Sequence, residues 1–595
     1  MEQSFHKLPE LTKENLDAVM AERLDATKTD TTSIPMLWQG LLEMEIPTEG
    51  ERRTAKLYIP KDTPQGTAFV LLNLPDGAEP LTFLQESGWL ACADRQQLPL
   101  FLAEPSPGGW KSPAEEQTYI DACVQALFAG RFLRAGMSVY LVGYGAVGTC
   151  LHRFALHTPL RVAAAVFLDA SQLDETEIDQ AETESLDGEG MRFDISKKDI
   201  PVPVWILEYE KRTKATAALT HWCSAIEAGE AVKDPVLGTI FSQRNENVCT
   251  PDGPIARVCW KQSDEKRTAP TMTEAIVSFL RGYARYNKFG PYGNSLVPYV
   301  DYERQGVEVR HYPDEDGHLR ECLVYVPKGF RDQGKLPLVF AIHGSSESVR
   351  NYLEESLLYR LADQEGFLVA MPETKLYKLP DSLTGGAPIA YRARWESCAG
   401  WGMEVASCAE HDLRYFSRVL DALVAEYPVD EKRIYGTGHS NGFMMMSLLA
   451  SSPCGRRFAS AAMTSGVTTV WDDSGTAPVP VWMTMGEYDL WSYRLEDETG
   501  LTAGLDRWLI RNGLADETNA KEKRLNGADT RYTDGRHHAT VWKDGRGSPR
   551  IRYDWIEKKD HMNTSEENRR FWDEWFSRWS FDENGERRYT APEER

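Results

Sequence analysis

A serine between two glycines is the residue of this chain best placed for covalent chemistry. Residues 438–442 read Gly-His-Ser-Asn-Gly, follow a β-like run and precede an apolar run that predicts a helix. Glycines two residues before and two after Ser440 remove Cβ clashes in a strained strand-to-helix turn that exposes a nucleophilic hydroxyl. The pattern predicts a catalytic serine, and the alternative is a tight connection whose serine only caps the helix.

A serine hydroxyl needs a general base and an acid that orients the base. Hydrolases with this turn carry them downstream of the serine in the order acid, then histidine. Asp489 follows an apolar predicted strand, with Glu487 as the reserve acid, although a loop aspartate taken alone is most often a solvated turn residue. His561 lies between the last predicted strand and a helix predicted over residues 565–579. We therefore predict Ser440, Asp489 and His561 as a catalytic triad.

Other histidines compete for the role of the base. His537 and His538 lie in a polar, glycine-bearing segment that we expect to be exposed, and a lone histidine is more often structural or solvent-facing than catalytic. His439 is adjacent to the serine, but neighbouring side chains on such a turn diverge. We expect His439 to shape the substrate pocket instead.

Backbone donors must stabilise the oxyanion that acyl transfer creates. We predict the N–H of Asn441, the residue after the nucleophile, and the N–H of Ser345, which follows a predicted strand and the pair His343-Gly344. The alternative for the second donor is an ordinary strand-to-helix turn. Aromatic side chains are further candidates for the substrate pocket, although tryptophans mostly fill cores. These candidates are Trp395, Trp401, Trp491 and Tyr493.

These motifs resemble the polyhydroxybutyrate depolymerase and feruloyl esterase group of α/β-hydrolases over about residues 300–580. The resemblance rests on residues 420–442, with a helix, a Tyr-Pro-Val-Asp turn and a Ser-Asn-Gly elbow, and on Trp395, Asp412, His343-Gly344 and Gly486 to Asp489. It implies carboxylic ester substrates such as hydroxyalkanoate oligomers or hydroxycinnamoyl and acetyl sugar esters. The chain departs from the group's pattern at Phe443, at Met485 and in the Asp-His-Met-Asn setting of His561, and these departures bear on the substrate.

The first half of the chain resembles a diverged copy of the second half. Residues 57–61 echo 324–328, and residues 201–205 echo 478–482. A repeat of this size indicates a duplicated domain rather than a solenoid unit. Gly145 stands in the place of the nucleophile, Pro75 removes a backbone donor from the oxyanion loop, and no histidine occurs between Val258 and Ala284. We interpret residues 1–286 as a catalytically degenerate α/β-hydrolase domain.

The predicted fold class is α/β, with two tandem α/β-hydrolase domains whose mostly parallel sheets are flanked by helices. At 595 residues and 42% hydrophobic composition, the chain can bury two cores of roughly 250 to 300 residues each. Residues 287–299 have the composition of a linker, and residues 300–595 form the predicted catalytic domain. We expect the two halves to pack as an internal pseudo-dimer, and homo-oligomerisation is left open.

A formal net charge of −23 argues against binding nucleic acid or anionic membranes. The acidic run 174–182 is expected to be an exposed loop. No apolar run approaches the roughly 18 residues of a membrane span, and the first residues do not read as a secretion signal. The ten cysteines lack a C-x-x-C pair, which favours reduced thiols in a cytoplasmic protein, although Cys398 and Cys408 could pair in an exported one. No cofactor or metal is expected.

The residues together predict a serine esterase that works through an acyl-enzyme. One alternative is an oligopeptidase-like serine peptidase, which shares the fold and the triad, but the propeller-like repeats of about 40 residues that would gate its site are not seen. A second alternative is a non-catalytic binding or assembly protein, which the degenerate first half favours. Labelling of Ser440 by a fluorophosphonate discriminates this last alternative from an enzyme.

Overall fold

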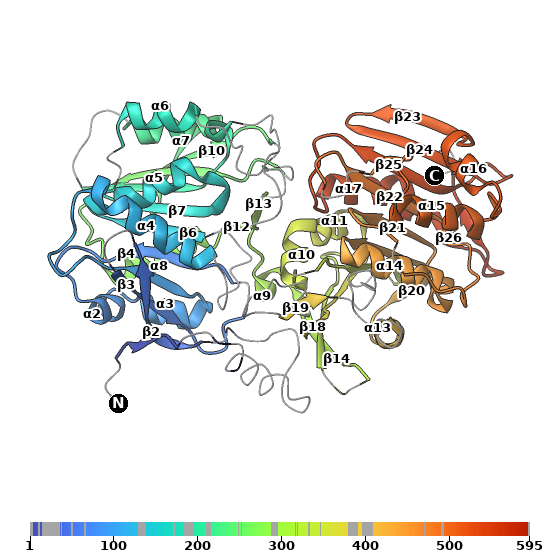
Figure 1. Ribbon diagram of the computed structural model, residues 1–595, viewed down its shortest axis with the longest axis horizontal. Coiled ribbons are helices and arrows are strands. Elements are labelled where there is room, and N and C mark those ends of the chain that lie inside the picture. The colour runs from blue at the N-terminus through green and yellow to red at the C-terminus, as the bar shows by residue number, and fades with distance from the viewer. Residues whose placement is uncertain are drawn as a thin grey trace. The chain divides into compact units, whose positions relative to one another are not determined.

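Figure 1 shows the computed structural model of the chain. The residues described are those outside 1–3, 10–11, 13, 15–35, 37, 49–51, 65–66, 129–138, 171–172, 184–195, 210–215, 248, 251–252, 287–294, 316, 318, 331–333, 346, 379–390, 395–408, 469, 490–492 and 593–595. Trp395, Trp401, Trp491, Cys398 and Cys408 fall among the excluded residues, so the predictions on them lie outside the described part of the chain.

The described chain divides into two compact units between Tyr299 and Val300. Most of the predicted linker, residues 287–294, lies outside the described residues. Its end is structured, however, because β13 (Leu296–Pro298) pairs antiparallel with β12 (Tyr283–Arg285). This part of the predicted linker is therefore an element of the first unit.

Within its described residues, the second unit contains a sheet of ten strands in the order β14-β15-β17-β16-β20-β21-β22-β25-β24-β23. These strands are β14 (Val307–Pro313), β15 (Leu319–Tyr325), β16 (Leu336–Ile342), β17 (Leu368–Pro372), β20 (Val429–His439), β21 (Ser460–Thr464), β22 (Val481–Gly486), β23 (Thr530–Asp534), β24 (His537–Lys543) and β25 (Pro549–Ile556). The six strands from β17 to β25 run parallel, and antiparallel pairs lie at both edges.

Helices cover both faces of this sheet (Figure 1). They are α9 (Tyr302–Gln305), α10 (Val349–Ser356), α11 (Leu358–Glu365), α13 (Ala409–Glu426), α14 (Asn441–Ser451), α15 (Gly500–Arg511), α16 (Ala520–Asn526) and α17 (Ser565–Arg570). Every residue of β16 is buried, and alternate residues join different cores. Phe340 packs with α13 to α15, whereas Val339 packs with α10 and α11. A strand with period-two side chains and no polar face must be covered on both sides.

The C-terminal helix differs from the prediction. The expected helix over residues 565–579 ends as an α-helix at Arg570, and a π-helical turn (Phe571–Trp575) and a 3₁₀ turn (Phe576–Arg578) follow. The aromatic side chains of the π turn are buried in the core that also holds Val339. The departure from regular α-helical winding thus coincides with the burial of these large rings.

The first unit repeats the topology of the second. Its sheet has the order β1-β2-β3-β5-β4-β6-β7-β8-β11-β10-β9. The strands are β1 (His6–Lys7), β2 (Gly40–Pro47), β3 (Arg52–Ile59), β4 (Val70–Asn73), β5 (Leu100–Ala103), β6 (Val139–Tyr144), β7 (Val162–Leu168), β8 (Val204–Glu208), β9 (Ala228–Asp234), β10 (Gly238–Gln243) and β11 (Arg257–Gln262). Once β1 is set aside, the connection order and the parallel or antiparallel sense of each pair match those of the second unit.

The helices of the first unit pack on a core of their own. They are α2 (Pro80–Glu86), α3 (Trp89–Gln96), α4 (Pro113–Phe128), α5 (Thr149–His157), α6 (Glu175–Thr183), α7 (Ala217–Ala225) and α8 (Pro270–Leu280). The acidic run 174–182 was expected to be a loop, but it forms most of α6, whose Ile178 is buried. Apolar anchoring of one helix face outweighs the repulsion between its exposed carboxylates.

The predicted α/β fold class, with mostly parallel sheets flanked by helices, is confirmed in both units. In the part of the chain that the structure describes, no helix has both the length and the apolar character needed to cross a bilayer.

Candidate active site

Ser440 occupies the sharp turn between β20 and α14. It has φ 55° and ψ −115°, a backbone conformation that is strained for a residue with a side chain. The flanking glycines are needed for close approach. A Cβ on Gly438 would lie 2.2 Å from the carbonyl oxygen of Gly442, and a Cβ on Gly442 would lie 2.1 Å from that of Ile342. The turn therefore depends on glycine at both places, for the steric reason that the sequence pattern indicates.

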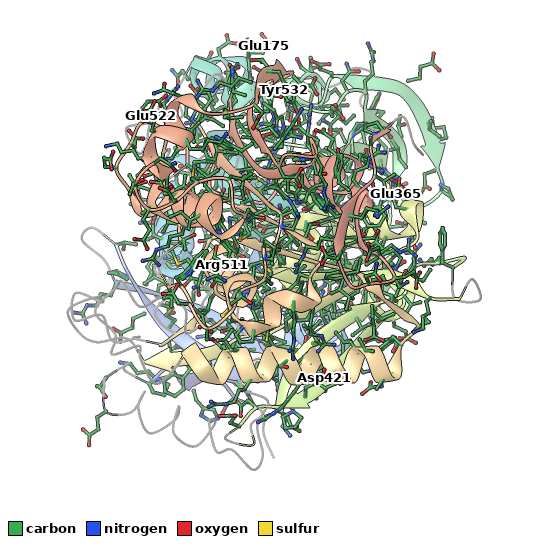
Figure 2. The ribbon with its side chains drawn as sticks, turned by 90° about the vertical axis from the view of Figure 1, so that its right-hand side faces the viewer. Glu175, Glu365, Asp421, Arg511, Glu522 and Tyr532 are labelled. Carbon is green, nitrogen blue, oxygen red and sulfur yellow. The ribbon has the colours of Figure 1, made fainter. Side chains whose placement is uncertain are left out.

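The helix after the serine is anchored at its far end. Arg511 of α15, labelled in Figure 2, donates from Nη1 to the carbonyl oxygen of Ser451 at 3.0 Å. Ser451 is the last residue of α14. A cation at the carboxyl end of a helix satisfies a carbonyl without an intrahelical partner and interacts favourably with the helix dipole. The helix that carries Asn441 at its first position is thereby tied to α15 at its other end.

The structure brings the three predicted triad residues together. Ser440 follows β20, Asp489 follows β22 and His561 follows β25, so all three lie at the carboxyl edge of the parallel strands. The Nε2 atom of His561 is 2.8 Å from the Oγ atom of Ser440, and its Nδ1 atom is 2.9 Å from the Oδ1 atom of Asp489. The reserve acid, Glu487, instead accepts a backbone hydrogen bond from Lys558 at 3.0 Å.

The electrostatics of Asp489 favour its charged form. Burial by itself would raise the pKa of this carboxyl group, but the charge and hydrogen bond of His561 and the charge of Lys559 together lower the pKa below its ordinary value. An ionised Asp489 accepts a hydrogen bond from Nδ1–H, which leaves Nε2 of His561 able to accept a proton from Ser440. The arrangement can therefore activate a serine for attack on an acyl carbon.

The loops that carry the predicted oxyanion donors meet at the turn. Gly442 packs against the carbonyls of Ile342 and His343, at the end of β16. The N–H of Gly344 donates to Oε2 of Glu347 at 2.6 Å, which fixes the loop that leads into Ser345. Asn441 begins α14 and is buried. The role of Asn441 and Ser345 as oxyanion donors stays a prediction.

His343 ties the same loop to a buried acid. Its Nδ1 atom is 2.8 Å from the carbonyl oxygen of Gly344, and its Nε2 atom is 2.7 Å from Oε1 of Glu373. Burial would lower the pKa of His343, but the charge of Glu373 raises it above its ordinary value. The other oxygen of Glu373 accepts the N–H of Val349 at 2.9 Å. Sequence reasoning used His343 only as a marker of the loop and missed Glu373, which no motif indicates.

His439 lies inside the site rather than at its rim. Its side chain is 1% exposed, its ring centroid is 5.0 Å from that of His561, and its Nδ1 atom is 3.2 Å from Oε1 of Glu347. Through Glu347 it is linked to the N–H of Gly344, so it connects the nucleophile turn with the predicted oxyanion loop. Its contact with substrate stays a prediction.

The expectation that His537 is exposed is wrong. His537 begins β24 and is 1% exposed, with Nδ1 3.3 Å from Asp554 and Nε2 3.1 Å from Glu566. Its charged partners, from β25 and α17, allow burial that the polar local sequence did not indicate. His538, the next residue, is half-exposed and is 2.7 Å from Oε1 of Glu557.

Sequence reasoning also missed a buried lysine beside the triad. Lys559 lies in the same loop as His561, and its side chain is fully buried. Its Nζ atom donates to Ser465 Oγ at 2.6 Å and to Thr464 Oγ1 at 3.0 Å. The local sequence Lys-Lys-Asp is typical of a solvated loop. The hydroxyls of Thr464 and Ser465 lie almost a hundred residues away in the sequence, and only the folded chain brings them within hydrogen-bonding distance of Lys559.

The equivalent places in the first unit hold different residues. Gly145, with φ 64° and ψ −166°, occupies the turn after β6. Arg267 is the fifth residue after β11, as His561 is the fifth after β25. Its Nε atom donates to Oδ2 of Asp169 at 3.0 Å, and its guanidinium carbon lies 3.6 Å from the ring centroid of Tyr209. A guanidinium does not give up its proton at neutral pH and cannot serve as a base.

Residues 321–484 match the family model described as Esterase PHB depolymerase. The match begins in the second unit's sheet and includes the Ser440 turn, but it ends before Asp489 and His561. The match to this esterase family is thus a likeness of one stretch of the second unit.

Individual relatives cover only part of the chain. The chain is 26% identical over 182 residues to the bifunctional acetylxylan esterase/xylanase XynS20E of Neocallimastix patriciarum, covering 30% of this chain and 23% of that protein. It is 27% identical over 163 residues to the probable acetylxylan esterase A of Neosartorya fischeri, covering 27% of this chain and 38% of that protein. The chain thus spans well under half the length of these relatives. A solved acetyl xylan esterase from Aspergillus awamori aligns with a TM-score of 0.29 and 15% identity, covering 45% of this chain and 99% of that one.

Proposed function

We propose that the second unit, with its Esterase PHB depolymerase region, hydrolyses carboxylic esters through an acyl-enzyme on Ser440. The observation that carries the proposal is the pair of contacts made by one imidazole. His561 is 2.8 Å from the Ser440 hydroxyl through Nε2 and 2.9 Å from the Asp489 carboxylate through Nδ1. Hydrolysis by a serine needs a nucleophile that is hydrogen-bonded to a base, and a base that is hydrogen-bonded to an orienting acid.

Acylation begins when Ser440 Oγ attacks the ester carbonyl carbon and passes its proton to Nε2 of His561. Asp489 holds Nδ1–H and stabilises the imidazolium that forms. The carbonyl oxygen becomes an oxyanion, for which we propose the N–H groups of Asn441 and Ser345 as donors. When the tetrahedral intermediate collapses, the bond to the alkoxy oxygen breaks, and the leaving alcohol takes the proton from His561.

Deacylation repeats the steps with water. His561 takes a proton from the water as its oxygen attacks the acyl carbon, and a second oxyanion forms at the same donors. The bond to Ser440 Oγ then breaks, the proton returns to Oγ, and the carboxylic acid leaves. One ester and one water yield one acid and one alcohol, and the enzyme is regenerated.

The proposed substrates are small or oligomeric esters. Acetylated sugars are favoured because both relatives are acetylxylan esterases by name, and hydroxyalkanoate esters are favoured by the description of the family model. Hydroxycinnamoyl sugar esters complete the set that the sequence resemblance implies.

The test compares wild type with Ser440→Ala on a panel of acetyl, hydroxybutyryl and feruloyl esters. Turnover should fall on the order of a million-fold, because the variant lacks the nucleophile. Ser447→Ala is the matched control, since Ser447 is a buried serine of the same helix, two turns from the site. It should retain both turnover and fluorophosphonate labelling. Unchanged ester cleavage in Ser440→Ala would overturn the proposal.

A further inference from the structure

A buried cation lies beneath the triad. The Nζ atom of Lys559 donates to Ser465 Oγ at 2.6 Å and Thr464 Oγ1 at 3.0 Å, and it lies 3.5 Å from Oε1 of Glu567. Neither side chain of the Lys559–Glu567 pair has any exposed surface. Removing two charges from water is costly, and buried ion pairs often contribute little to stability. A buried pair next to a reactive site therefore invites a functional explanation.

Glu567 is held as firmly as its partner. Its Oε1 atom accepts hydrogen bonds from the hydroxyls of Thr464 at 2.8 Å and Thr484 at 2.6 Å. Its Oε2 atom accepts the N–H and the hydroxyl of Thr564, both at 3.0 Å, in a capping box that begins α17. The carboxylate thus joins β21, β22 and α17, and it presents a fixed negative charge to Lys559.

The backbone of Lys559 joins the base loop to the acid loop. Its carbonyl oxygen accepts the N–H of Tyr488 at 2.9 Å, next to Asp489. A Cβ on Gly486 would lie 2.2 Å from that same carbonyl oxygen, so the two loops touch through a glycine. His561 is two residues further along the chain. The position of Lys559 therefore couples the placement of the acid to that of the base.

The side chain of Lys559 lies close to the acid, with Ser465 beside both. The Ser465 hydroxyl accepts a hydrogen bond from the ammonium at 2.6 Å and contacts the carbonyl oxygen of Met562, the residue after His561, at 3.4 Å. The hydroxyl, like the ammonium, also contributes to the lowered pKa of Asp489. The charge of Lys559 lowers the pKa of Asp489, in addition to the effect of His561.

We propose that Lys559 is a positioning residue of the triad, whose ammonium is held by Glu567 and Ser465 so that a fixed positive charge and a fixed loop keep Asp489 aligned with His561. This proposal rests on the proposed function. The charged and titratable groups that face Asp489 are His561 and Lys559 from the base loop and Tyr553 from β25. Those that face Lys559 are Glu567 from α17 and Asp489 from the acid loop.

The competing explanation is that Lys559 only neutralises Glu567. Two variants of the full chain separate the two roles. Lys559→Met with Glu567→Gln removes both charges and retains similar volumes, so no unpaired charge is buried. Glu567→Gln alone is the matched control, because it keeps the ammonium beside Asp489. For each, kcat, KM and the pH profile of kcat/KM are measured on an ester that wild type cleaves, along with the melting temperature.

The double variant should lose about ten-fold or more in kcat with little change in KM, since alignment matters to proton transfer rather than to binding. The acidic limb of its kcat/KM profile should move about one pH unit higher, because a positive charge that opposes protonation of the site is gone. Glu567→Gln should keep its acidic limb at or below that of wild type.

Ser465→Ala keeps the proposal testable if the double variant does not fold. It removes only the hydroxyl that accepts a hydrogen bond from the ammonium beside Asp489, and it should lower kcat about three-fold to ten-fold with a smaller shift of the acidic limb in the same direction. Wild-type kcat and an unmoved limb in whichever of these two variants folds would overturn the positioning role. If wild type itself cleaves no ester and resists fluorophosphonate, the proposed function fails, and this proposal fails with it.

Discussion

The two units share one scaffold but differ where chemistry would occur. Both carry a strand-to-helix turn at positive φ, 64° at Gly145 and 55° at Ser440. Both turns are closed by glycines. A Cβ on Gly148 would lie 2.6 Å from the carbonyl carbon of Gly143, much as one on Gly438 would meet Gly442. Both units therefore meet the steric requirements of the turn, although only the second unit has a hydroxyl at it.

The two units also differ at the loops that correspond to the predicted oxyanion loop and to the loop of the base. Asn73, at the end of β4, donates to the carbonyl of Tyr144 at 2.9 Å and accepts its N–H at 2.8 Å, which ties the loop to the strand before the turn. The corresponding end of β16 leads instead to His343 and its buried acid. Arg267 is paired with Asp169, whereas His561 contacts a serine. We infer that the first unit does not carry the triad chemistry of the second, because the residues at these places make internal contacts instead.

Exchanging the turn residues tests this inference most severely. Ser440→Gly should lower ester turnover on the order of a million-fold, the loss expected for a missing nucleophile, without lowering the melting temperature, because glycine adopts positive φ without strain. Gly145→Ser in the Ser440→Ala background should restore neither turnover nor fluorophosphonate labelling. Labelling at position 145 would show that the first unit still holds a working base.

Alanine in place of one turn glycine should lower the stability of whichever unit carries it, but it should lower ester turnover only in the second unit. Gly442→Ala and Gly148→Ala each place a methyl group against backbone atoms, at 2.1 Å and 2.6 Å, and each should destabilise its own unit by about 3 kcal/mol. Thermal unfolding and ester turnover are measured together. Gly148→Ala should retain full turnover at 25 °C, and a large loss would mean that the first unit contributes to catalysis.

Acid should weaken the first unit through His152. This residue is buried, with Nδ1 3.1 Å from the carbonyl oxygen of Ala170 and Nε2 accepting the indole N–H of Trp222 at 2.8 Å. Burial lowers its pKa to about 3. Below the unfolded pKa of about 6.5 only the unfolded chain takes up the proton, so stability falls as pH drops from about 6.5 to about 3, by about 2 kcal/mol at pH 5.

Thermal unfolding at pH 7.5 and pH 5 measures this effect, with His152→Gln as the variant that cannot titrate. The variant should lose most of the pH dependence of the first unit. His343 in the second unit has the opposite sign, because its pKa is raised. Its contribution to stability is fully present below the unfolded pKa and is lost as pH rises through the folded value. An equal pH dependence in wild type and His152→Gln would contradict the assignment.

Much of the site could be predicted because its signals are local. The spacing of Gly438, Ser440 and Gly442 reports a steric requirement of one turn, and the order of acid and histidine follows from parallel strands whose carboxyl ends share one edge. His537 and Lys559 could not be placed in this way. Their local sequences are polar, and their burial depends on partners such as Glu566 and Ser465, which come from other elements.

The amino-acid sequence by itself determined the α/β class, the strained turn at Ser440 and the residues that could form a triad, because period-two and glycine patterns act over a few residues. Only the tertiary structure decided that the His561 ring spans the gap between Ser440 and Asp489, and that Lys559 is buried beneath them. Those facts depend on distances between chain segments that lie about 70 to 120 residues apart. Packing sets such distances, and no local pattern encodes them.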